Sequence, residues 1–310
     1  MEISVVIPVY NKEQFVEQCL VKTLSQDFDS FEVIAVDDGS TDASGNICDQ
    51  VAKRDQRLRV VHTKNGGVTA ARRKGLEQST GKYVMFLDAD DELMPNALRV
   101  SHEIIISNDA DEVIALYKNQ DGTVFDSGRR GFVDYRDIIK NFLATHNSFQ
   151  PLWGILFKKE LLEGCFDFPR EIIIGEDILT HIRALMKQPR VFCANHCSYL
   201  YVQGLPNTRK RSLQHEVTYD EVLRHSLQPL WTEMERWFQL HQLKAYEVFL
   251  DERQFHVYKD YYHSLRGHID KRLPLTDRIA FALPPHIAYL PVHFYKKWLR
   301  LKSKQIFYYT

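Results

Sequence analysis

Residues 83–91 read YVMFLDADD, a short apolar run that ends in three acids within four positions. A continuous apolar run of this length predicts a buried strand. In extended backbone, residues two apart face the same side, so Asp88 and Asp90 are expected to point together past the end of the strand. The stretch therefore predicts a strand that carries a pair of carboxylates at its carboxyl end.

The same arrangement recurs along the amino-terminal part of the chain. Apolar, β-branched runs are each followed by a polar loop and then by a segment with helical spacing or a capping residue, such as Asn11 after the first run. Strands that alternate with helices over short links indicate right-handed βαβ units and a parallel sheet. The other predicted strands are residues 3–8, 31–36, 58–62 and 112–117.

The polar loops after these strands are predicted to form one site. In open α/β sheets, ligands bind at the carboxyl ends of the strands. Loops that lie far apart in the sequence should therefore meet in a single crevice. These loops are residues 8–11, 37–42, 64–67 and 88–91.

The chemistry of Asp88 and Asp90 depends on what lies between them. Two carboxylates aimed into one crevice repel each other unless a cation is bound, and hard oxygen ligands suit Mg²⁺ or Mn²⁺ together with phosphate oxygens. Asp-x-Asp is also common in solvated turns and at helix N-termini, where the dipole favours acids. The preceding strand favours the metal site, because it places both acids at the edge of the sheet.

Further candidate groups lie in the second loop and in or near the third. Asp37 and Asp38 are placed to accept the imide N–H of a uracil or the hydroxyls of a ribose, or else to shape their turn. Lys64 and Arg72 are cations of the kind that a diphosphate needs, and arginine offers a bidentate fork. The sequence therefore predicts a phosphorylated ligand, with the turn-forming role of the acids as the alternative.

Two more acids, Glu176 and Asp177, follow Gly175 at the start of a later predicted helix. The helix dipole explains acids at this position. Their functional interpretation is a general base, which must come within hydrogen-bond distance of an attacking hydroxyl. The spacing alone favours the first explanation. A zinc site within residues 193–197 is not favoured, because only three soft ligands lie close together, without a second pair.

Composition excludes several classes of protein. The chain has 40 Lys and Arg against 41 Asp and Glu, a formal net charge of −1, which excludes a basic nucleic-acid-binding protein. No run of about 18 uncharged apolar residues is present, so no transmembrane helix is expected. The N-terminus lacks the basic region of a signal peptide, and five scattered cysteines fit a reducing compartment. A cytoplasmic location is therefore expected.

The pattern changes toward the C-terminus, where residues 206–310 are rich in aromatic residues and are predicted to be mostly helical. We expect one domain over residues 1–205 and a mainly helical extension after it. In the extension no acid follows Asp277. The cationic, aromatic residues 293–310 suit either contact with an anionic membrane surface or a docked helix with solvated lysines. The sequence also leaves a homodimer open.

Five motifs follow one another in the order found in a known family. They are residues 4–11 (SVVIPVYN), 37–42 (DDGSTD), 65–72 (NGGVTAAR), 86–91 (FLDADD) and 175–177 (GED). With these motifs the chain resembles family 2 glycosyltransferases of the GT-A fold, which include many bacterial enzymes that build surface polysaccharides. The resemblance covers the predicted first domain. It implies an α/β, Rossmann-like fold with a mostly parallel sheet flanked by helices.

The resemblance also implies a chemistry on the donor side. Enzymes of this family are inverting and use a nucleotide-sugar, most often UDP-linked, with Mg²⁺ or Mn²⁺. Asp90 would coordinate the metal, and Asp88 would hold the ribose side or a water on the metal. Asp38 would bind the uracil. The implied nucleotide-binding residues are Pro8, Tyr10, Asp38, Arg72, Asp88 and Ala89.

On the acceptor side, the resemblance implies that Asp177 is the catalytic base, that Glu176 lies beside the acceptor and that Trp153 lines the acceptor site. The implied reaction is transfer of a sugar, with inversion, to a hydroxyl of a glycan or lipid-linked acceptor in capsule, exopolysaccharide or lipopolysaccharide synthesis. The alternative is a non-catalytic nucleotide-sugar-binding protein of the same fold. A nucleotidyltransferase is less favoured, because residues 9–12 are not a glycine-rich, basic loop.

The sequence departs from the family pattern in two places. Arg73 stands where the family often has Asn, and a later segment near the donor phosphates is only loosely matched by residues 199–209. Four cations therefore remain candidates to touch the diphosphate beside Arg72, and the sequence does not choose among them. They are Lys64, Arg73, Lys210 and Arg211.

Overall fold

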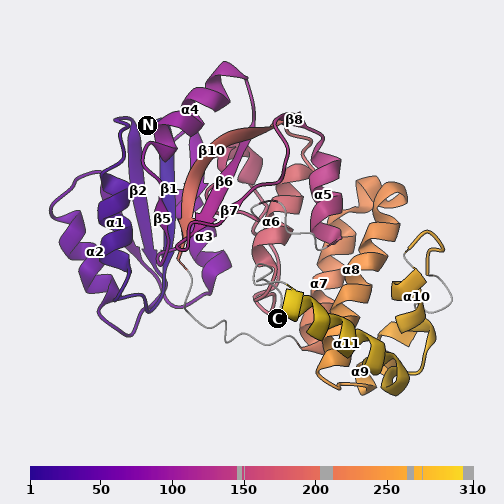
Figure 1. Ribbon diagram of the computed structural model, residues 1–310. Helices are drawn as coiled ribbons and strands as arrows, with labels where there is room; N and C mark the ends of the chain where they lie inside the picture. The colour runs from indigo at the N-terminus through magenta and orange to yellow at the C-terminus, as the bar shows by residue number, and fades with distance from the viewer. Residues whose placement is uncertain (145–148, 150, 203–211, 264–268, 274, 303–310) are drawn as a thin grey trace. The chain divides into compact units, whose positions relative to one another are not determined.

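The computed structural model describes residues 1–144, 149, 151–202, 212–263, 269–273 and 275–302 (Figure 1). The chain divides into two compact units, which are residues 1–142 with 147–210 and residues 143–146 with 211–310. Each unit has its own hydrophobic core. The two are described separately.

The first unit is built on a sheet with the strand order β3-β2-β1-β4-β9-β6-β10-β5. Its first half is parallel, because β1 pairs in parallel with β2 and β4, and β2 with β3. Since β2 and β4 lie on opposite sides of β1, the strand order reverses there, and such a switch point is where open α/β sheets bind ligands. The first four predicted strands are confirmed as β1 (Ile3–Val9), β2 (Phe31–Asp37), β3 (Leu58–His62) and β4 (Tyr83–Phe86).

Helices cover both faces of this half of the sheet, which explains why its strands are apolar throughout rather than alternating. Val5 and Ile7 of β1 belong to one cluster with side chains of α1, α2 and α4. The alternate residue Val6 faces α3, where a Cβ on Gly75 would lie only 2.2 Å from the Val6 Cγ1. Glycine therefore permits a close approach of α3 to the sheet. The four helices are α1 (Val16–Leu24), α2 (Ser44–Ala52), α3 (Val68–Gln78) and α4 (Ala97–Ser107).

The second half of the sheet is mixed. β9 runs antiparallel to both β4 and β6, while β10 runs parallel to β6 and antiparallel to β5 and β8. The predicted strand at residues 112–117 is confirmed within β6. These strands are β5 (Glu92–Leu93), β6 (Glu112–Asn119), β7 (Val124–Phe125), β8 (Gly131–Val133), β9 (Leu156–Lys158) and β10 (Val191–Tyr201). The unit also contains α5 (Tyr135–Leu143), the 3₁₀ helix η1 (Lys159–Leu162) and α6 (Glu176–Leu185).

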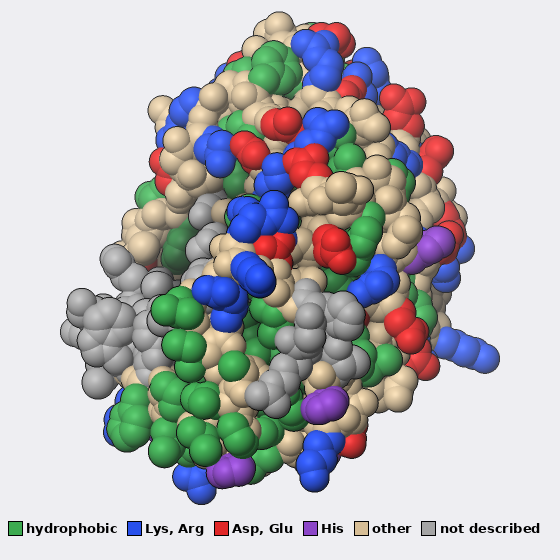
Figure 2. Space-filling model, turned by 90° about the vertical axis from the view of Figure 1, so that its right-hand side faces the viewer, with side chains coloured by type: hydrophobic (Ala, Val, Ile, Leu, Met, Phe, Trp, Pro, Cys, Tyr) green, Lys and Arg blue, Asp and Glu red, His purple; other side chains and the backbone are tan. Residues whose placement is uncertain are grey.

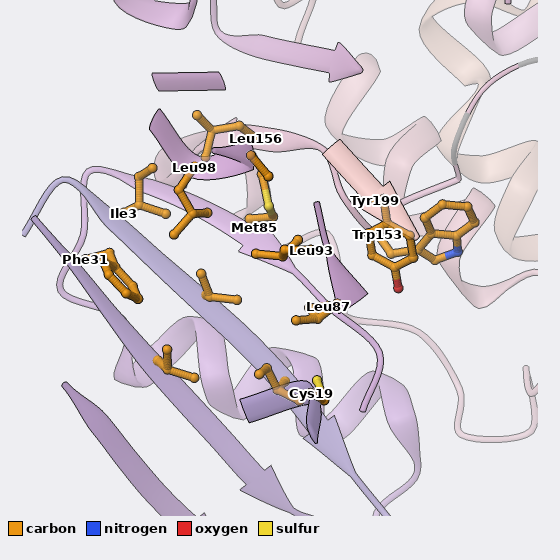
Figure 3. Close-up of a cluster of buried hydrophobic side chains, with 14 of the residues drawn as sticks. Ile3, Cys19, Phe31, Met85, Leu87, Leu93, Leu98, Trp153, Leu156 and Tyr199 are labelled. Atoms are coloured by element: carbon orange, nitrogen blue, oxygen red, sulfur yellow. The ribbon is translucent and has the colours of Figure 1, made fainter. Parts of the chain in front are cut away.

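The core of the first unit runs from β2 across to β10. Figure 3 shows Phe31 and Ile3 at one end of this cluster and Trp153 beside Tyr199 at the other. The Trp153 and Tyr199 rings stack with centroids 4.5 Å apart at an angle of 30°. Fully burying one large apolar side chain contributes about 1.5–3 kcal/mol, so this packing fixes the end of β10 firmly.

The second unit is helical, as predicted for the C-terminal part. Its core is aromatic, with Tyr246, Phe249, Tyr262 and Phe281 almost wholly buried. The aromatic-rich composition of this region is therefore explained by packing. Among the described residues, no helix is both long enough and apolar enough to cross a membrane. The elements are α7 (Leu213–Ser226), η2 (Gln228–Leu230), α8 (Trp231–Asp251), α9 (His256–Asp260), α10 (Leu275–Ala282) and α11 (Pro285–Lys302).

Candidate active site

Asn11 joins the first loop to the second. It adopts a left-handed backbone with φ 52°, and its Oδ1 accepts the backbone N–H of Thr41 at 2.8 Å. The prediction that Asn11 caps the following helix is wrong, because α1 begins only at Val16. Asparagine tolerates left-handed backbone better than most residues, so it serves the loop instead. The neighbouring Tyr10, at the end of β1, is 46% exposed.

Both acids of the second loop accept hydrogen bonds from nearby loops. Asp37 accepts the backbone N–H of Ser40 at 3.0 Å and pairs with His62 at 2.9 Å. Burial raises the pKa of Asp37, but the bonds from Ser40 and His62 outweigh it and lower the pKa. Asp38 is only 3% exposed and accepts the two backbone N–H groups of Gly66–Gly67, each at 2.8 Å. The second loop is thus tied to the third.

Arg72, on the helix α3 that follows the third loop, pairs with the fourth loop. Its guanidinium donates to Asp88 Oδ1 at 2.9 Å, and the side chain is 4% exposed. Burial alone would lower the pKa of Arg72, but the carboxylates of Asp88, Glu176 and Asp177 raise it. The Arg72 Nε has no hydrogen-bond partner among the described residues, although buried donors are rarely left unpaired. An anionic ligand that accepts this N–H would complete the site.

Glu176 and Asp177 are the first two residues of α6, after Gly175 in a left-handed conformation with φ 76°. Glu176 is 7% exposed, and Asp177 is half-buried. Burial raises the pKa of Asp177, the charge of Arg72 opposes this rise, and the charge of Asp88 adds to it. The start of α6 therefore lies within electrostatic reach of Arg72 on α3 and of the fourth loop.

Asp90 is linked to the first loop, because its Oδ2 lies 2.5 Å from Lys12 Nζ. Lys12 follows Asn11 directly, and its backbone N–H donates to Ser44 Oγ at 2.7 Å. Lys12 was not among the residues predicted from the sequence. The sequence shows only a cation just after the first strand, because the pairing of β1 with β4 appears only in the folded sheet.

The third acid of the motif, Asp91, is 2% exposed and points into the core. It accepts the hydroxyl of Tyr199 at 2.6 Å and the backbone N–H of Val202 at 2.7 Å. The same Tyr199 oxygen accepts the backbone N–H of Asp88 at 3.3 Å. Burial, together with the charge of Asp88, raises the pKa of Asp91 to about 8. Sequence reasoning missed this pair, because Tyr199 lies 108 residues along the chain.

The other predicted residues differ in exposure. Pro8 is half-buried in β1, and Ala89 is 2% exposed, which leaves mainly its backbone for contact with a ligand. Trp153 is 9% exposed, with Tyr199 against one face and Tyr117 edge-on at 4.8 Å. Little of the ring is free to stack on a sugar, and its acceptor role stays a prediction.

Two of the four undecided cations are described. Arg73 is 51% exposed and pairs with Asp167 at 3.2 Å, while Lys64 is exposed. Lys210 and Arg211 lie outside the described residues. On α3, therefore, Arg72 pairs with the acidic loop and Arg73 does not.

The carboxylates of the fourth loop are candidate ligands for a divalent cation. Within the described ranges, no group of three or more His, Cys, Asp and Glu side chains is placed to hold a metal ion. Asp88 pairs with Arg72, and Asp90 pairs with Lys12, so each of these carboxylates binds a positive charge. Mg²⁺ and Mn²⁺ suit hard oxygen ligands, and Mg²⁺ sites commonly combine one or two carboxylates with substrate phosphates. The donor set fits a cation that arrives with a phosphorylated ligand.

Two other features of the first unit, a cavity and a half-buried histidine, lie away from the four loops. A cavity of about 610 Å³ lies beside the amino end of β4, lined in part by Lys82, Lys158 and Glu160. His196 on β10 shares a hydrogen bond with Ser101 at 3.1 Å, and burial lowers its pKa to about 4. The cavity is at the opposite edge of the sheet from the four loops.

The charged side chains from these loops and from α6 form one cluster, which we call the acidic site: Lys12, Arg72, Asp88, Asp90 and Asp177. It lies after β1 and β4, at the switch point of the sheet. A buried arginine with an unpaired N–H, beside carboxylates at the carboxyl ends of the strands, is typical of sites in α/β proteins that suit a phosphorylated ligand.

Comparison with known proteins identifies the family to which this chain belongs. A family model described as glycosyl transferase family 2 matches residues 4–166. The chain belongs to glycosyltransferase family 2, as its motifs predicted. GlyA, a glycosyltransferase of Streptococcus pneumoniae, is 31% identical over 213 residues, which are 64% of this chain and 30% of GlyA. EpsJ of Bacillus subtilis, an uncharacterized glycosyltransferase, is 30% identical over 220 residues, which are 66% of this chain and 62% of EpsJ. The chain thus spans less than two thirds of the length of these curated relatives.

Solved structures confirm the predicted GT-A fold, including its helical C-terminal part. TarS of S. aureus, residues 1–349 in complex with UDP-GlcNAc, is similar with a TM-score of 0.65 and 20% identity, covering 100% of this chain and 95% of that one. The mannosyltransferase PcManGT of Pyrobaculum calidifontis, in complex with GDP-Man and Mn²⁺, has a TM-score of 0.51 and 18% identity, covering 96% and 88%. At these identities the likeness shows the fold alone.

Proposed function

We propose that this chain transfers a sugar from a nucleotide-sugar to a hydroxyl of a glycan or lipid-linked acceptor, with inversion at the anomeric carbon. The observation that carries the proposal is the position of Arg72. This one buried guanidinium acts both on Asp88, in the donor-side loop, and on Asp177, at the start of α6. The leaving group and the candidate base would thus share one site, as a direct displacement requires.

In this proposal the donor is a UDP-sugar. Tyr10, exposed at the end of β1, suits packing against the base together with Pro8. Asp38 would accept the imide N–H of uracil while it holds the Gly66–Gly67 backbone. The unpaired Nε of Arg72 would donate to the nucleotide, whose ribose side lies against Asp88 and Ala89. The UDP-GlcNAc bound by TarS supports this choice of donor.

We assign Asp90, with Asp88 beside it, to hold Mg²⁺ or Mn²⁺. When bound there, the metal would act as a Lewis acid and template that offsets negative charge on the departing nucleotide. The hard oxygen donors of the two aspartates support the assignment, and the Mn²⁺ in the PcManGT complex agrees with it. The chain itself contributes the carboxylates and the adjacent guanidinium of Arg72.

Asp177 is the proposed base. It takes the proton from the acceptor hydroxyl as that oxygen attacks the anomeric carbon from the face opposite the diphosphate, which inverts the configuration. The rise in the pKa of Asp177 caused by burial improves it as a proton acceptor, while Arg72 limits the rise and favours the carboxylate before reaction. Glu176 and Trp153 complete the acceptor side in this proposal.

The acceptor belongs, in our proposal, to the synthesis of a capsule, exopolysaccharide or lipopolysaccharide, and the protein works against the inner face of the membrane. Figure 2 shows hydrophobic side chains gathered on the lower part of the face it displays. Among the residues of the helical unit whose exposure is described, the exposed large hydrophobic ones lie on α10 and α11, namely Leu275, Ile279, Ile287, Leu290 and Phe294. Those of α11 follow the spacing of a single helix face, as in helices that lie on membrane surfaces. Residues 303–310 of the cationic tail lie outside the described residues.

The proposal is tested by incubating the full-length protein with a panel of nucleotide-sugars, a divalent cation and lipid-linked acceptors, and by identifying products with mass spectrometry. We expect an acceptor that gains one sugar, and nucleoside diphosphate released in equal amount. The alternative, a non-catalytic nucleotide-sugar-binding protein, predicts donor binding without any transfer or hydrolysis. Release of pyrophosphate from sugar phosphate and a nucleoside triphosphate would instead indicate a nucleotidyltransferase.

A further inference from the structure

The link between Lys12 and Asp90 is the feature of the acidic site that the proposed reaction does not use. Lys12 Nζ lies 2.5 Å from Asp90 Oδ2, and the two side chains are 26% and 21% exposed. The backbone of Lys12 is fixed by its bond to Ser44 Oγ at 2.7 Å. The backbone of Lys12 is therefore fixed after β1, while its side chain reaches the loop after β4.

Each of the two outward acids thus has its own positive side chain, but the two cations differ. Arg72 is 4% exposed and is surrounded by Asp88, Glu176 and Asp177, so it has little freedom to leave. Lys12 is partly exposed and carries its charge on a flexible stem of four carbons. Of these two cations, Lys12 is the one that can give way to another positive charge at Asp90.

We infer that Lys12 is a resident counter-ion of Asp90 that a divalent cation must displace, so that Lys12 sets how tightly the site holds its metal. The inference rests on the proposed metal ligand Asp90. The ammonium occupies Asp90 Oδ2 at 2.5 Å, and its positive charge opposes a metal cation at either oxygen of this carboxylate. Removing the ammonium should therefore raise the affinity of the site for the metal.

The size of the effect follows from the exposure of the pair. Partly exposed ion pairs are worth at most about 1 kcal/mol, which corresponds to about fivefold in an equilibrium constant. We therefore expect Lys12→Gln to bind Mn²⁺ about fivefold more tightly than the wild-type protein. A surface salt bridge with no link to the metal would leave the affinity unchanged.

The test titrates Mn²⁺ into the full-length protein saturated with UDP, with free Mn²⁺ followed by electron paramagnetic resonance. The matched control is Lys53→Gln, since Lys53 is an exposed lysine at the end of α2. Asp90→Asn shows whether the titrated site is the proposed one. We expect tighter binding in Lys12→Gln, unchanged binding in Lys53→Gln and weak binding in Asp90→Asn.

The outcomes separate this inference from the proposed function. Equal or weaker Mn²⁺ binding in Lys12→Gln, with binding still lost in Asp90→Asn, overturns the role of Lys12 and leaves the metal site standing. Mn²⁺ binding that is insensitive to Asp90→Asn, or absent from the wild-type protein, overturns the proposed metal site and the inference together.

Discussion

At the scale of single residues, neighbouring arginines on α3 have different surroundings. Arg72 is 4% exposed and bonded to Asp88, with its Nε unpaired among the described residues. Arg73 is 51% exposed and turned toward Asp167. A buried donor without a partner costs about 1–3 kcal/mol, which a bound ligand can recover. The structure therefore distinguishes two residues that the sequence presents as a run of like charges.

The role of Asp177 is tested by Asp177→Asn. The amide keeps the shape of the side chain but cannot take up the proton of the acceptor hydroxyl, so we expect transfer to fall by about 10²- to 10⁴-fold, the usual contribution of a general base. Binding of UDP should persist, because Arg72 and Asp88 remain. Steady-state transfer and UDP titration measure the two effects, with the exposed Asp167→Asn as control. Normal turnover by Asp177→Asn would show that another group is the base.

At the scale of elements, α3 positions the acidic site through its contact with β1. Because a Cβ at residue 75 would lie 2.2 Å from Val6, the helix that carries Arg72 sits as close to the sheet as glycine allows. The burial of Arg72 therefore depends on the contact of Gly75, on the same helix, with Val6 of β1.

Gly75→Ala tests this contact. Alanine favours a helix over glycine by about 1 kcal/mol, but overpacking costs about 1–3 kcal/mol, and at 2.2 Å we expect the steric cost to dominate. The variant should unfold at lower urea concentration and bind UDP less tightly. The double variant Val6→Ala/Gly75→Ala should be more stable than the sum of the single changes predicts. If Gly75→Ala stabilised the protein, α3 would not be held by this contact.

In the helical unit, Asp220 of α7 joins neighbouring elements through hydrogen bonds from Gln242 of α8 and Tyr261, both at 2.8 Å. Burial raises the pKa of Asp220 to about 7, although these bonds oppose the rise. The usual pKa of aspartate is about 3.9. Between about pH 4 and pH 7, Asp220 therefore keeps its proton in the folded protein and loses it in the unfolded chain.

The stability contributed by Asp220 should accordingly be full below about pH 4 and fall as the pH rises to 7. Asp220→Asn removes this titration. We expect the loss of stability between pH 5 and pH 8, measured by urea unfolding, to be smaller in Asp220→Asn than in the wild-type protein. Asp260→Asn, at an exposed aspartate of α9, should behave as wild type. An unchanged pH dependence in Asp220→Asn would mean that Asp220 is charged in both states.

At the scale of the whole molecule, the features predicted correctly are those set by local patterns. The apolar runs, the polar loops and the helical C-terminal part were read from residues near one another in sequence, and the parallel half of the sheet follows from strand–helix alternation. The five motifs identified the family, because their order over the chain is more specific than any one of them. The acidic side chains at the strand ends were predicted for the same reason.

The features that were missed depend on distant partners. Asn11 was expected to cap α1, but its side chain accepts Thr41 of another loop. Lys12 and Asp90 are 78 residues apart, and the pairing appears only when β1 and β4 are neighbours. The antiparallel β9 enters the sheet between strands that sequence order alone would place together. Such contacts leave no periodic signal.

The proposed membrane contact of the helical unit is tested by sedimentation with vesicles. Leu290→Ser/Phe294→Ser removes two exposed side chains from one face of α11. We expect the wild-type protein to sediment with vesicles of anionic phospholipid more than with neutral ones, and the double variant to remain largely in solution. Val21→Ser, at an exposed residue of α1, is the control. Equal sedimentation of the wild type and the double variant would remove these residues from the proposal.

We propose that segments far apart in the sequence build one site for a nucleotide around Arg72. Calorimetric titration of UDP, with Mg²⁺ present, into Arg72→Lys and Arg73→Lys tests it most directly, because the two changes are chemically identical and adjacent in sequence. Loss of the guanidinium fork at a buried site should weaken UDP binding at least about tenfold in Arg72→Lys, which corresponds to about 1.4 kcal/mol. Arg73→Lys should bind UDP as the wild type does. Wild-type affinity in Arg72→Lys, or an equal loss in both variants, would mean that the nucleotide does not bind at the Arg72 guanidinium.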